Sequence, residues 1–205
     1  MEKGSNEQPG TGKMNKTLIQ KENYILLNLK DIVSIVAGII LVFSLLFRVV
    51  VVSGPSMKDT LVDGDWLILV GNIFYNEPKA GDIIVASKQT FEDGKPVIKR
   101  VIATEGQKVD IDFENGIVYV DDIALEEDYT RTPTNLYEGV SFPLIVEEGC
   151  IFVMGDNRNE SKDSRSPEIG LIDQREVIGR AVFIVFPGND GGEEERDFAR
   201  IGVLS

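Results

Sequence analysis

The sequence predicts a mainly β domain that follows a single membrane-spanning helix. Two patterns carry this prediction: an apolar stretch over residues 32–52, and a series of short strand-like segments, separated by turn residues, over residues 66–186. No sustained helical periodicity follows Val52. With 205 residues, the chain has room for one anchor and one domain of ordinary size, and hardly for two independent enzymes.

Residues 1–30 precede the apolar stretch and are predicted to form a flexible cytoplasmic tail. Residues 1–20 are rich in small and polar residues, so ordering them would bury too little apolar surface to offset the loss of chain entropy. The tail holds five Lys and three Glu, whereas Asp59 and Asp63 follow the apolar stretch. By the positive-inside rule, the N-terminus faces the cytoplasm and residues 53–205 face outward.

Residues 31–52 are predicted to form a transmembrane anchor helix. From Ile32 through Val52 the stretch has 21 residues, near the roughly 20 that a helix needs to cross a hydrocarbon core. A buried core helix is one alternative, but a segment without a polar face is hard to cover beside so small a domain. A cleavable signal peptide is another, and the length, the 30 preceding residues and the lack of a following Ala-x-Ala site disfavour it.

Residues 53–205 are predicted to form an extracytoplasmic β domain. Turn pairs such as Asp-Gly and Asn-Gly separate its apolar runs. Strict alternation over residues 108–112 predicts a strand with one face in solvent. From about residue 188 the C-terminal tail, with its acidic segment 191–195, is predicted to be disordered. The expected strands are 66–70, 82–86, 97–103, 108–112, 117–120, 150–154 and 177–186.

The composition excludes several classes of function. The chain has no His, which removes Ser-His-Asp and Cys-His hydrolases and His-ligated zinc enzymes. Its one cysteine, Cys150, allows neither an intrachain disulfide nor a cysteine-cluster metal site, and no cofactor or metal is expected. A formal charge of −13 repels phosphate, so no nucleic-acid partner is expected. A serine hydrolase without His needs another base, and the pKa of lysine falls readily on burial.

Ser56 and Lys99 are the candidate Ser-Lys pair. Ser56 follows Gly54 in a turn, where its hydroxyl is exposed and its amide is free to face a substrate oxyanion. On composition alone, a turn-capping serine is the alternative. Alternation in the run 97–102 places Lys99 on an apolar strand face and Arg100 on the opposite face, exposed or ion-paired. An ordinary edge lysine is the alternative for Lys99.

Four segments, in order, resemble the sequence boxes of the bacterial type I signal peptidases. Together with the anchor, the resemblance extends from about residue 32 to residue 186, and it departs from the family at Asp59, where Pro or Ser is usual. It implies a coiled antiparallel β-sheet domain of the signal-peptidase/LexA-like kind. The four segments are Gly54-x-Ser56-Met57-x-x-Thr60-Leu61, 81–85, 97–102 and 155–165.

This resemblance implies a membrane-bound serine endopeptidase that removes N-terminal signal peptides from exported preproteins after small apolar residues, in the pattern Ala-x-Ala. Ser56 is then the nucleophile and Lys99 the general base. Ser161 is implied to orient the lysine amine, and Asp163 and Arg165 to form a buried ion pair that holds their loop. The substrate-binding residues carried over are Val52, Met57, Leu61 and Ile98.

The implied partners are the signal peptides of exported preproteins, the lipid bilayer and, by proximity, the protein-export machinery. The implied location is the cell membrane, with a single pass and an outward-facing catalytic domain. Two alternatives remain open. A self-cleaving repressor-type protease would use the same dyad but cut only its own chain, whereas an anchored β domain could bind extended peptides at a sheet edge without cutting them.

Overall fold

The computed structural model describes residues 11–189 and 196–204, with residues 11–27, Leu45 and Glu92 described by their backbone alone. The chain divides into two units, Met1–Leu45 and Leu46–Ser205, and each is described by itself. The predicted acidic segment 191–195 and the start of the predicted N-terminal tail lie outside the described residues.

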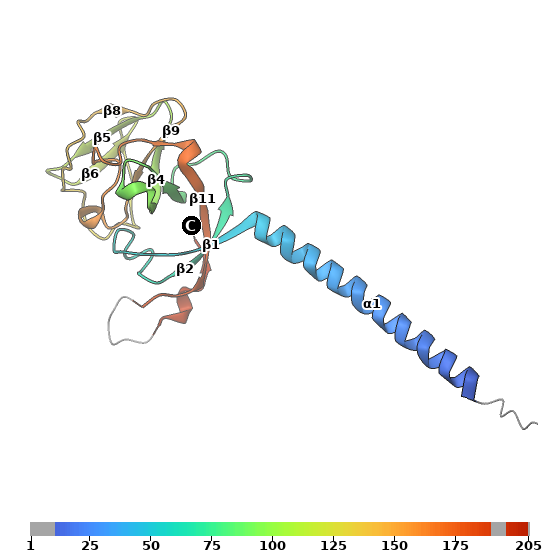
Figure 1. Cartoon of the computed structure of the whole chain (residues 1–205). Helices are drawn as coiled ribbons and strands as arrows, with labels where there is room; N and C mark the ends of the chain where they lie inside the picture. The colour runs from blue at the N-terminus through green and yellow to red at the C-terminus, as the bar shows by residue number, and fades with distance from the viewer. Residues whose placement is uncertain (1–10, 190–195, 205) are drawn as a thin grey trace, which may run out of the picture. The chain divides into compact units, whose positions relative to one another are not determined.

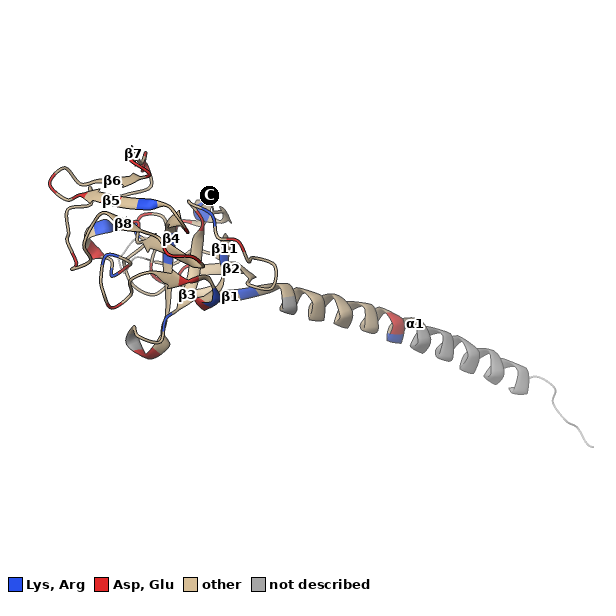
Figure 2. Ribbon diagram, turned by 90° about the horizontal axis from the view of Figure 1, so that it is seen from above, with Lys and Arg blue, Asp and Glu red and all other residues tan. Residues whose placement is uncertain are grey.

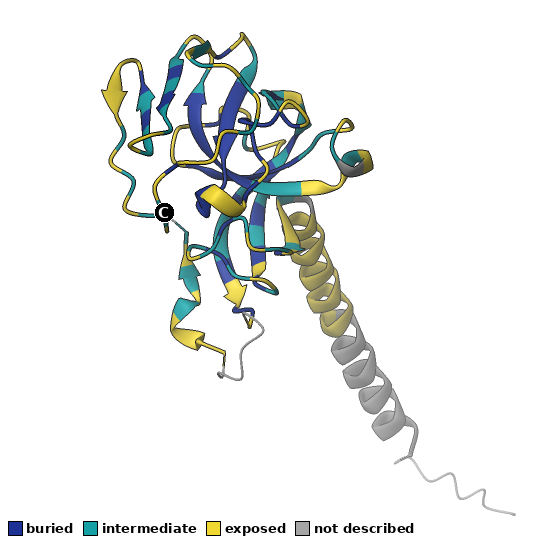
Figure 3. Cartoon of the chain, turned by 90° about the vertical axis from the view of Figure 1, so that its left-hand side faces the viewer, coloured by how far each residue is buried: buried dark blue, intermediate teal, exposed yellow. Residues whose placement is uncertain are grey.

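The first unit contains helix α1, Thr11–Leu46 (Figure 1). Residues 11–30, which the sequence predicts to be a flexible tail, are therefore helical, and their Leu, Lys, Gln and Glu residues favour that conformation. The side chains described in the helix, residues 28–44, are exposed (Figure 3). Within the part of the chain that the structure describes, no helix is both long enough and apolar enough to cross a membrane.

The segment predicted as anchor divides at Leu46, because the next five residues form strand β1, Phe47–Val51. Each residue of β1 pairs with one in the antiparallel strand β2, Trp66–Gly71. The four consecutive valines at 49–52, three of them in β1, favour an extended chain, and the pairing with β2 adds ladder hydrogen bonds that a helix could not make with a sheet.

The second unit is built on an antiparallel sheet of eight strands. Seven of the strands follow one another across the sheet in the order β1, β2, β11 (Val177–Phe186), β3 (Ile83–Ser87), β4 (Pro96–Thr104), β9 (Cys150–Met154) and β10 (Ile172–Asp173). The eighth, β12 (Gly202–Val203), pairs with β11. Residues 202–203 lie within the tail predicted to be disordered, and they therefore belong to the sheet instead.

A second sheet of four strands has the order β7 (Ile123–Ala124), β6 (Ile117–Val120), β5 (Lys108–Asp112) and β8 (Leu144–Ile145). Buried and half-buried residues alternate along β5, as its sequence predicts for a strand with one face toward solvent. All seven predicted strands are present, within one or two residues at their ends. The missed strands are β1 and four strands of only two residues, which are too short to show a period.

The core consists of three clusters, and alternation along β3 separates two of them. Ile83 and Val85 belong to the first cluster, whereas Ile84 and Ala86 belong to the third. The second cluster joins β4 and β9 to the inner face of the smaller sheet. The first cluster also takes in the loop after β1, through Val52, Met57 and Leu61, so this loop is held by apolar burial.

The C-terminal segment fastens the same loop through Asp65, which is fully buried. The Asp65 carboxylate accepts hydrogen bonds from the amides of Val62 and Gly188, at 2.8 and 2.6 Å, and from the Arg200 guanidinium at 2.7 and 2.9 Å. Arg200 also donates to the carbonyl of Thr60. The 3₁₀ turn Phe198–Arg200 and β12 thereby order residues 196–204 against the loop between β1 and β2.

Candidate active site

Ser56 is half-buried and lies in the loop between β1 and β2, which Val52, Met57 and Leu61 anchor in the core. Asn157 holds it from across the sheet: its amide donates to the Ser56 carbonyl at 3.1 Å, and its side-chain Nδ2 donates to the Pro55 carbonyl, also at 3.1 Å. Within the described part of the chain, no group accepts a hydrogen bond from the Ser56 amide. This amide is therefore available to a ligand, as the sequence predicts.

Lys99 lies on β4, in register with Ile84 of β3, and is 4% exposed. Most Asp and Glu residues of the second unit lie in loops (Figure 2), whereas Lys99 and Arg100 are buried within a strand. The Lys99 amine donates to Ser56 Oγ at 2.7 Å. The structure thus brings together the two residues of the predicted dyad, which are 43 positions apart.

Burial lowers the pKa of Lys99 to about 8. Its ammonium loses hydration inside the protein, and this outweighs the nearby carboxylates of Asp163, Glu138 and Asp156, which favour the charged form. The Arg165 guanidinium lowers the pKa further. Since each pKa unit corresponds to about 1.4 kcal/mol, the neutral amine is accessible near neutral pH.

Arg100 is ion-paired, which is one of the two states that alternation allows. It is buried, and its Nε and Nη2 donate to the two carboxylate oxygens of Asp156 at 2.9 and 2.8 Å. Its guanidinium lies 4.1 Å from the centre of the Tyr129 ring. Asp156 also accepts a 2.6 Å hydrogen bond from the Thr60 hydroxyl. Asp156 therefore ties β4 to the loop that carries Ser56, a role that its sequence position does not reveal.

Asp163 and Arg165 form the predicted ion pair. Arg165 Nε lies 2.8 Å from Asp163 Oδ1, and both side chains are fully buried. The Ser161 hydroxyl donates to Asp163 Oδ2 at 2.9 Å, and among the described residues no hydrogen bond joins it to the Lys99 amine. Arg165 also donates to the carbonyls of Arg158 and Leu136, so the pair holds the loop in place.

Gly155 lies where the Ser56 loop meets the Ser161 loop. A Cβ atom at this position would lie 2.4 Å from the Ser56 carbonyl oxygen and 2.2 Å from Ser161 Oγ, far inside contact distance. Only glycine therefore allows the two loops to approach as they do. The sequence singles out Gly155 as part of a box and gives no sign of this contact.

A groove of about 540 Å³ runs past Ser56 and Lys99. Of the predicted substrate-binding residues, Val52, Met57 and Ile98 line it. Leu61 does not: it is fully buried in the first core cluster and lines a smaller cavity, of about 220 Å³, beside the same turn. The remaining lining of the groove is Val50, Val51, Ser53, Gly54, Pro55, Val85, Phe91, Lys95, Pro96, Val97 and Lys162.

Asp59, the departure from the box pattern, points away from this chemistry. Its side chain is 68% exposed and forms an ion pair with Arg131 at 3.3 Å. An exposed pair of this kind contributes little to stability. Across the residues that the structure describes, no group of three or more His, Cys, Asp or Glu is placed to hold a metal ion.

Comparison with known proteins gives consistent matches. Residues 25–186 match the family model described as "Signal peptidase, peptidase S26". A probable signal peptidase I-1 from Synechocystis is 38% identical over 166 residues, 75% of this chain and 81% of the relative. Signal peptidase I of Bacillus licheniformis is 33% identical over 83% of this chain and 93% of its own. Signal peptidase I T of Bacillus subtilis is 34% identical over 85% and 92%, respectively.

Proposed function

The chain belongs to the signal peptidase family, peptidase S26, and on this basis we propose that it is a signal peptidase I in which Ser56 is the nucleophile and Lys99 the general base. The observation that supports these two roles is the 2.7 Å contact between the buried Lys99 amine and Ser56 Oγ, beside an apolar groove. A substrate laid along the groove would place its scissile carbonyl next to this pair.

The reaction begins with Lys99 neutral. Ser56 Oγ attacks the scissile carbonyl carbon as the Lys99 amine takes the hydroxyl proton, and the free Ser56 amide faces the developing oxyanion. The Lys99 ammonium then gives this proton to the leaving amine, which departs with the mature protein. The Lys99 amine, now neutral again, takes a proton from water as the water oxygen attacks the ester carbonyl carbon. Lys99 then returns this proton to Ser56 Oγ as the signal peptide leaves.

Ser161, Asp163 and Arg165 support this pair in the proposal. Asp163 fixes the Ser161 hydroxyl, and Ser161 packs against Gly155, next to the Ser56 carbonyl. The buried ion pair with Arg165 holds this loop against the loop that carries Ser56. The role implied for Ser161, to orient the lysine amine, stays a prediction.

The substrate is the extended end of a signal peptide. Val52 and Met57 are nearly fully buried at the groove, so the surface that they leave is shallow and apolar and suits small side chains such as Ala. Ile98, on the facing strand, would contact the same side chains. The exposed apolar side chains along α1, from Ile32 to Phe43, support the further proposal that this helix attaches the chain to the cell membrane, close to the export machinery.

Incubation of the full chain with a purified preprotein tests this function. We expect cleavage after an Ala-x-Ala sequence, with the new N-terminus identified by mass spectrometry. A matched preprotein with Lys in place of the last Ala should be cut at least about 100-fold more slowly, because the apolar surface that Val52 and Met57 line disfavours a charged side chain. Equal cleavage of both preproteins, or cleavage of the enzyme chain alone, would contradict the proposal.

The rate should also depend on pH through Lys99. Because the amine acts as a base only when neutral, kcat/KM should rise about tenfold per pH unit at low pH and level off above pH 8, where the pKa of Lys99 lies. Initial rates on a fluorogenic peptide from pH 5.5 to 10 measure this profile. A flat profile in the stable protein would argue against a lysine base.

A further inference from the structure

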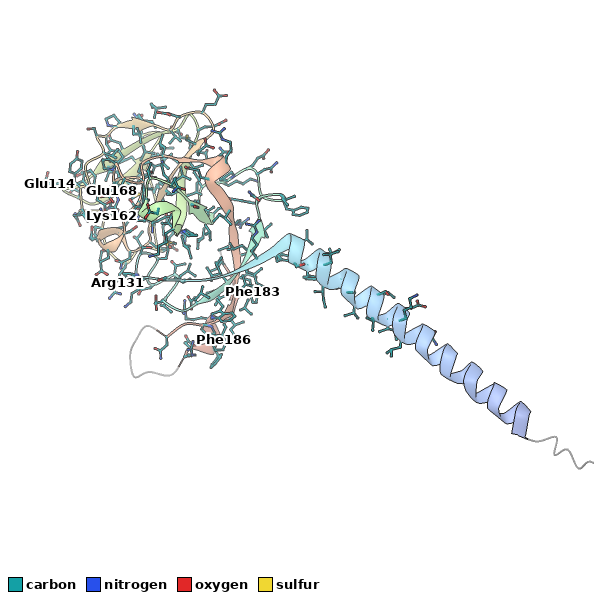
Figure 4. The ribbon with its side chains drawn as sticks, in the orientation of Figure 1. Glu114, Arg131, Lys162, Glu168, Phe183 and Phe186 are labelled. Carbon is teal, nitrogen blue, oxygen red and sulfur yellow. The ribbon has the colours of Figure 1, made fainter. Side chains whose placement is uncertain are left out.

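The C-terminal segment, residues 196–204, follows the part of the chain that matches the family, which ends at Phe186. The segment lies against β11, because β12 pairs with that strand and the ring of Phe198 meets the ring of Phe186 edge to face, with 5.9 Å between centroids (Figure 4). From this position Arg200 reaches the loop that carries Ser56. A charged residue from outside the family match therefore contacts the active-site loop.

Arg200 binds Asp65, a fully buried carboxylate that the proposed mechanism does not use. Nη1 and Nη2 of Arg200 donate to the two Asp65 carboxylate oxygens at 2.9 and 2.7 Å, and Nη2 also donates to the Thr60 carbonyl at 3.2 Å. The Arg200 side chain is 22% exposed, so salt and water screen this pair only in part. Two-pronged binding of this kind fixes the direction of the guanidinium as well as its distance.

Thr60 belongs to the same turn as Ser56, residues 55–61, which backbone hydrogen bonds of 3.0 and 2.8 Å close. The Thr60 hydroxyl donates to Asp156 at 2.6 Å, while its carbonyl accepts from Arg200. Arg200 and Asp156 thus hold Thr60 from two sides. Because the turn is compact, the position of Ser56, four residues before Thr60, depends on both contacts.

We propose that Arg200 is a positioning residue for the reaction, which acts through Thr60 to hold Ser56 Oγ at the Lys99 amine. This inference rests on the proposed function, because it concerns the same dyad. A displacement of about 1 Å at a catalytic group costs about 100-fold in rate, so a contact that fixes the turn affects the chemical step. Among the described residues that line the substrate groove, none comes from the segment 196–204, so substrate binding should depend little on Arg200.

Arg200→Met tests the proposal, since it removes the donors to both Asp65 and Thr60. We expect kcat on the fluorogenic peptide to fall about 10- to 100-fold, because the Ser56 hydroxyl no longer lies at its base in every molecule. KM should change by less than about 2-fold, because the groove keeps its lining. The acid limb of the pH profile should stay in place, since Arg200 is not among the groups that chiefly set the pKa of Lys99.

Arg200→Lys is the conservative variant. Its ammonium still compensates the buried charge of Asp65, so the fold should persist even if Arg200→Met does not fold. An ammonium is a single donor point and cannot hold the carboxylate and the Thr60 carbonyl in the geometry of a guanidinium. We therefore expect a partial recovery, with kcat about 3- to 10-fold below that of the wild type.

Arg196→Met is the matched control, because Arg196 lies in the same segment. It donates to the Pro187 carbonyl at 2.8 Å and lies 4.9 Å from the centre of the Phe186 ring. Among the described residues, no hydrogen bond joins it to the loop between β1 and β2. Its kcat should therefore stay within about 2-fold of the wild type.

The inference is overturned if folded Arg200→Lys has the kcat of the wild type, or if the Arg200 variants change KM alone. A lower unfolding temperature with unchanged kcat would likewise overturn it, because the contact would then serve stability only. Failure of the proposed function looks different, since the wild-type chain itself would then leave the preprotein uncut.

Discussion

Ser56→Ala and Lys99→Met are each expected to slow precursor processing by about three to four orders of magnitude, because each removes one side of the same proton transfer. Since the two residues act as a unit through one hydrogen bond, the double variant should be at most about a few-fold slower than the slower of the two single variants. Single-turnover assays with excess enzyme measure these rates. Losses that multiply in the double variant would show that the two residues act independently.

Lys99→Met should at the same time stabilise the fold. The pKa of Lys99 is lowered from 10.5 in the unfolded chain to about 8 in the folded protein, so its protonated form opposes folding. At pH 7 the substitution should therefore raise the free energy of unfolding by up to about 3 kcal/mol. The advantage is full below pH 8 and disappears as the pH rises toward 10.5, where the wild type no longer carries the charge.

Denaturant unfolding of the two proteins at several pH values measures this difference, and the comparison cancels contributions from other titrating groups. Ser56→Ala serves as the control, because it keeps the buried amine and should follow the pH dependence of the wild type. If the Lys99→Met protein were less stable than the wild type at pH 7, the contacts of the amine would stabilise the fold by more than the burial of its charge destabilises it.

Gly155→Ala is expected to lower the processing rate by at least about 100-fold, because a displacement of even about 1 Å at a catalytic group costs that much. The new methyl group would overlap the Ser56 carbonyl oxygen and Ser161 Oγ, so one of the two loops must move. Overpacking of this kind should also destabilise the fold by about 1–3 kcal/mol. Peptide cleavage and thermal unfolding measure the two effects.

Gly202→Ala is the matched control for this substitution. Gly202 lies in β12 with no atom within 4 Å of the added Cβ, so neither the rate nor the stability should change appreciably. If Gly155→Ala retained more than about half of the wild-type activity, the contact between the two loops would not determine the geometry of the dyad.

The strands illustrate what can be predicted from local patterns. β5 shows its alternation in five residues, and β11 is recognisable from its length and its many β-branched and aromatic residues. β1 was not predicted because its valines continue an apolar stretch, and only the partner strand β2 decides that they are extended. The two-residue strands β7, β8, β10 and β12 exist only because a neighbouring strand supplies their hydrogen bonds.

From the residue types alone it followed that a serine hydrolase without His needs another base, and the boxes that resemble the signal peptidases indicated Ser56 and Lys99 for this chemistry. Folding was needed to show that the Lys99 amine is buried and reaches Ser56, that Leu61 belongs to the core, and that Asp156 and Gly155 fix the loop that carries Ser56. The reason is physical: a residue's type fixes what it can donate or accept, whereas its pKa and its contacts depend on groups that only folding brings within a few ångströms.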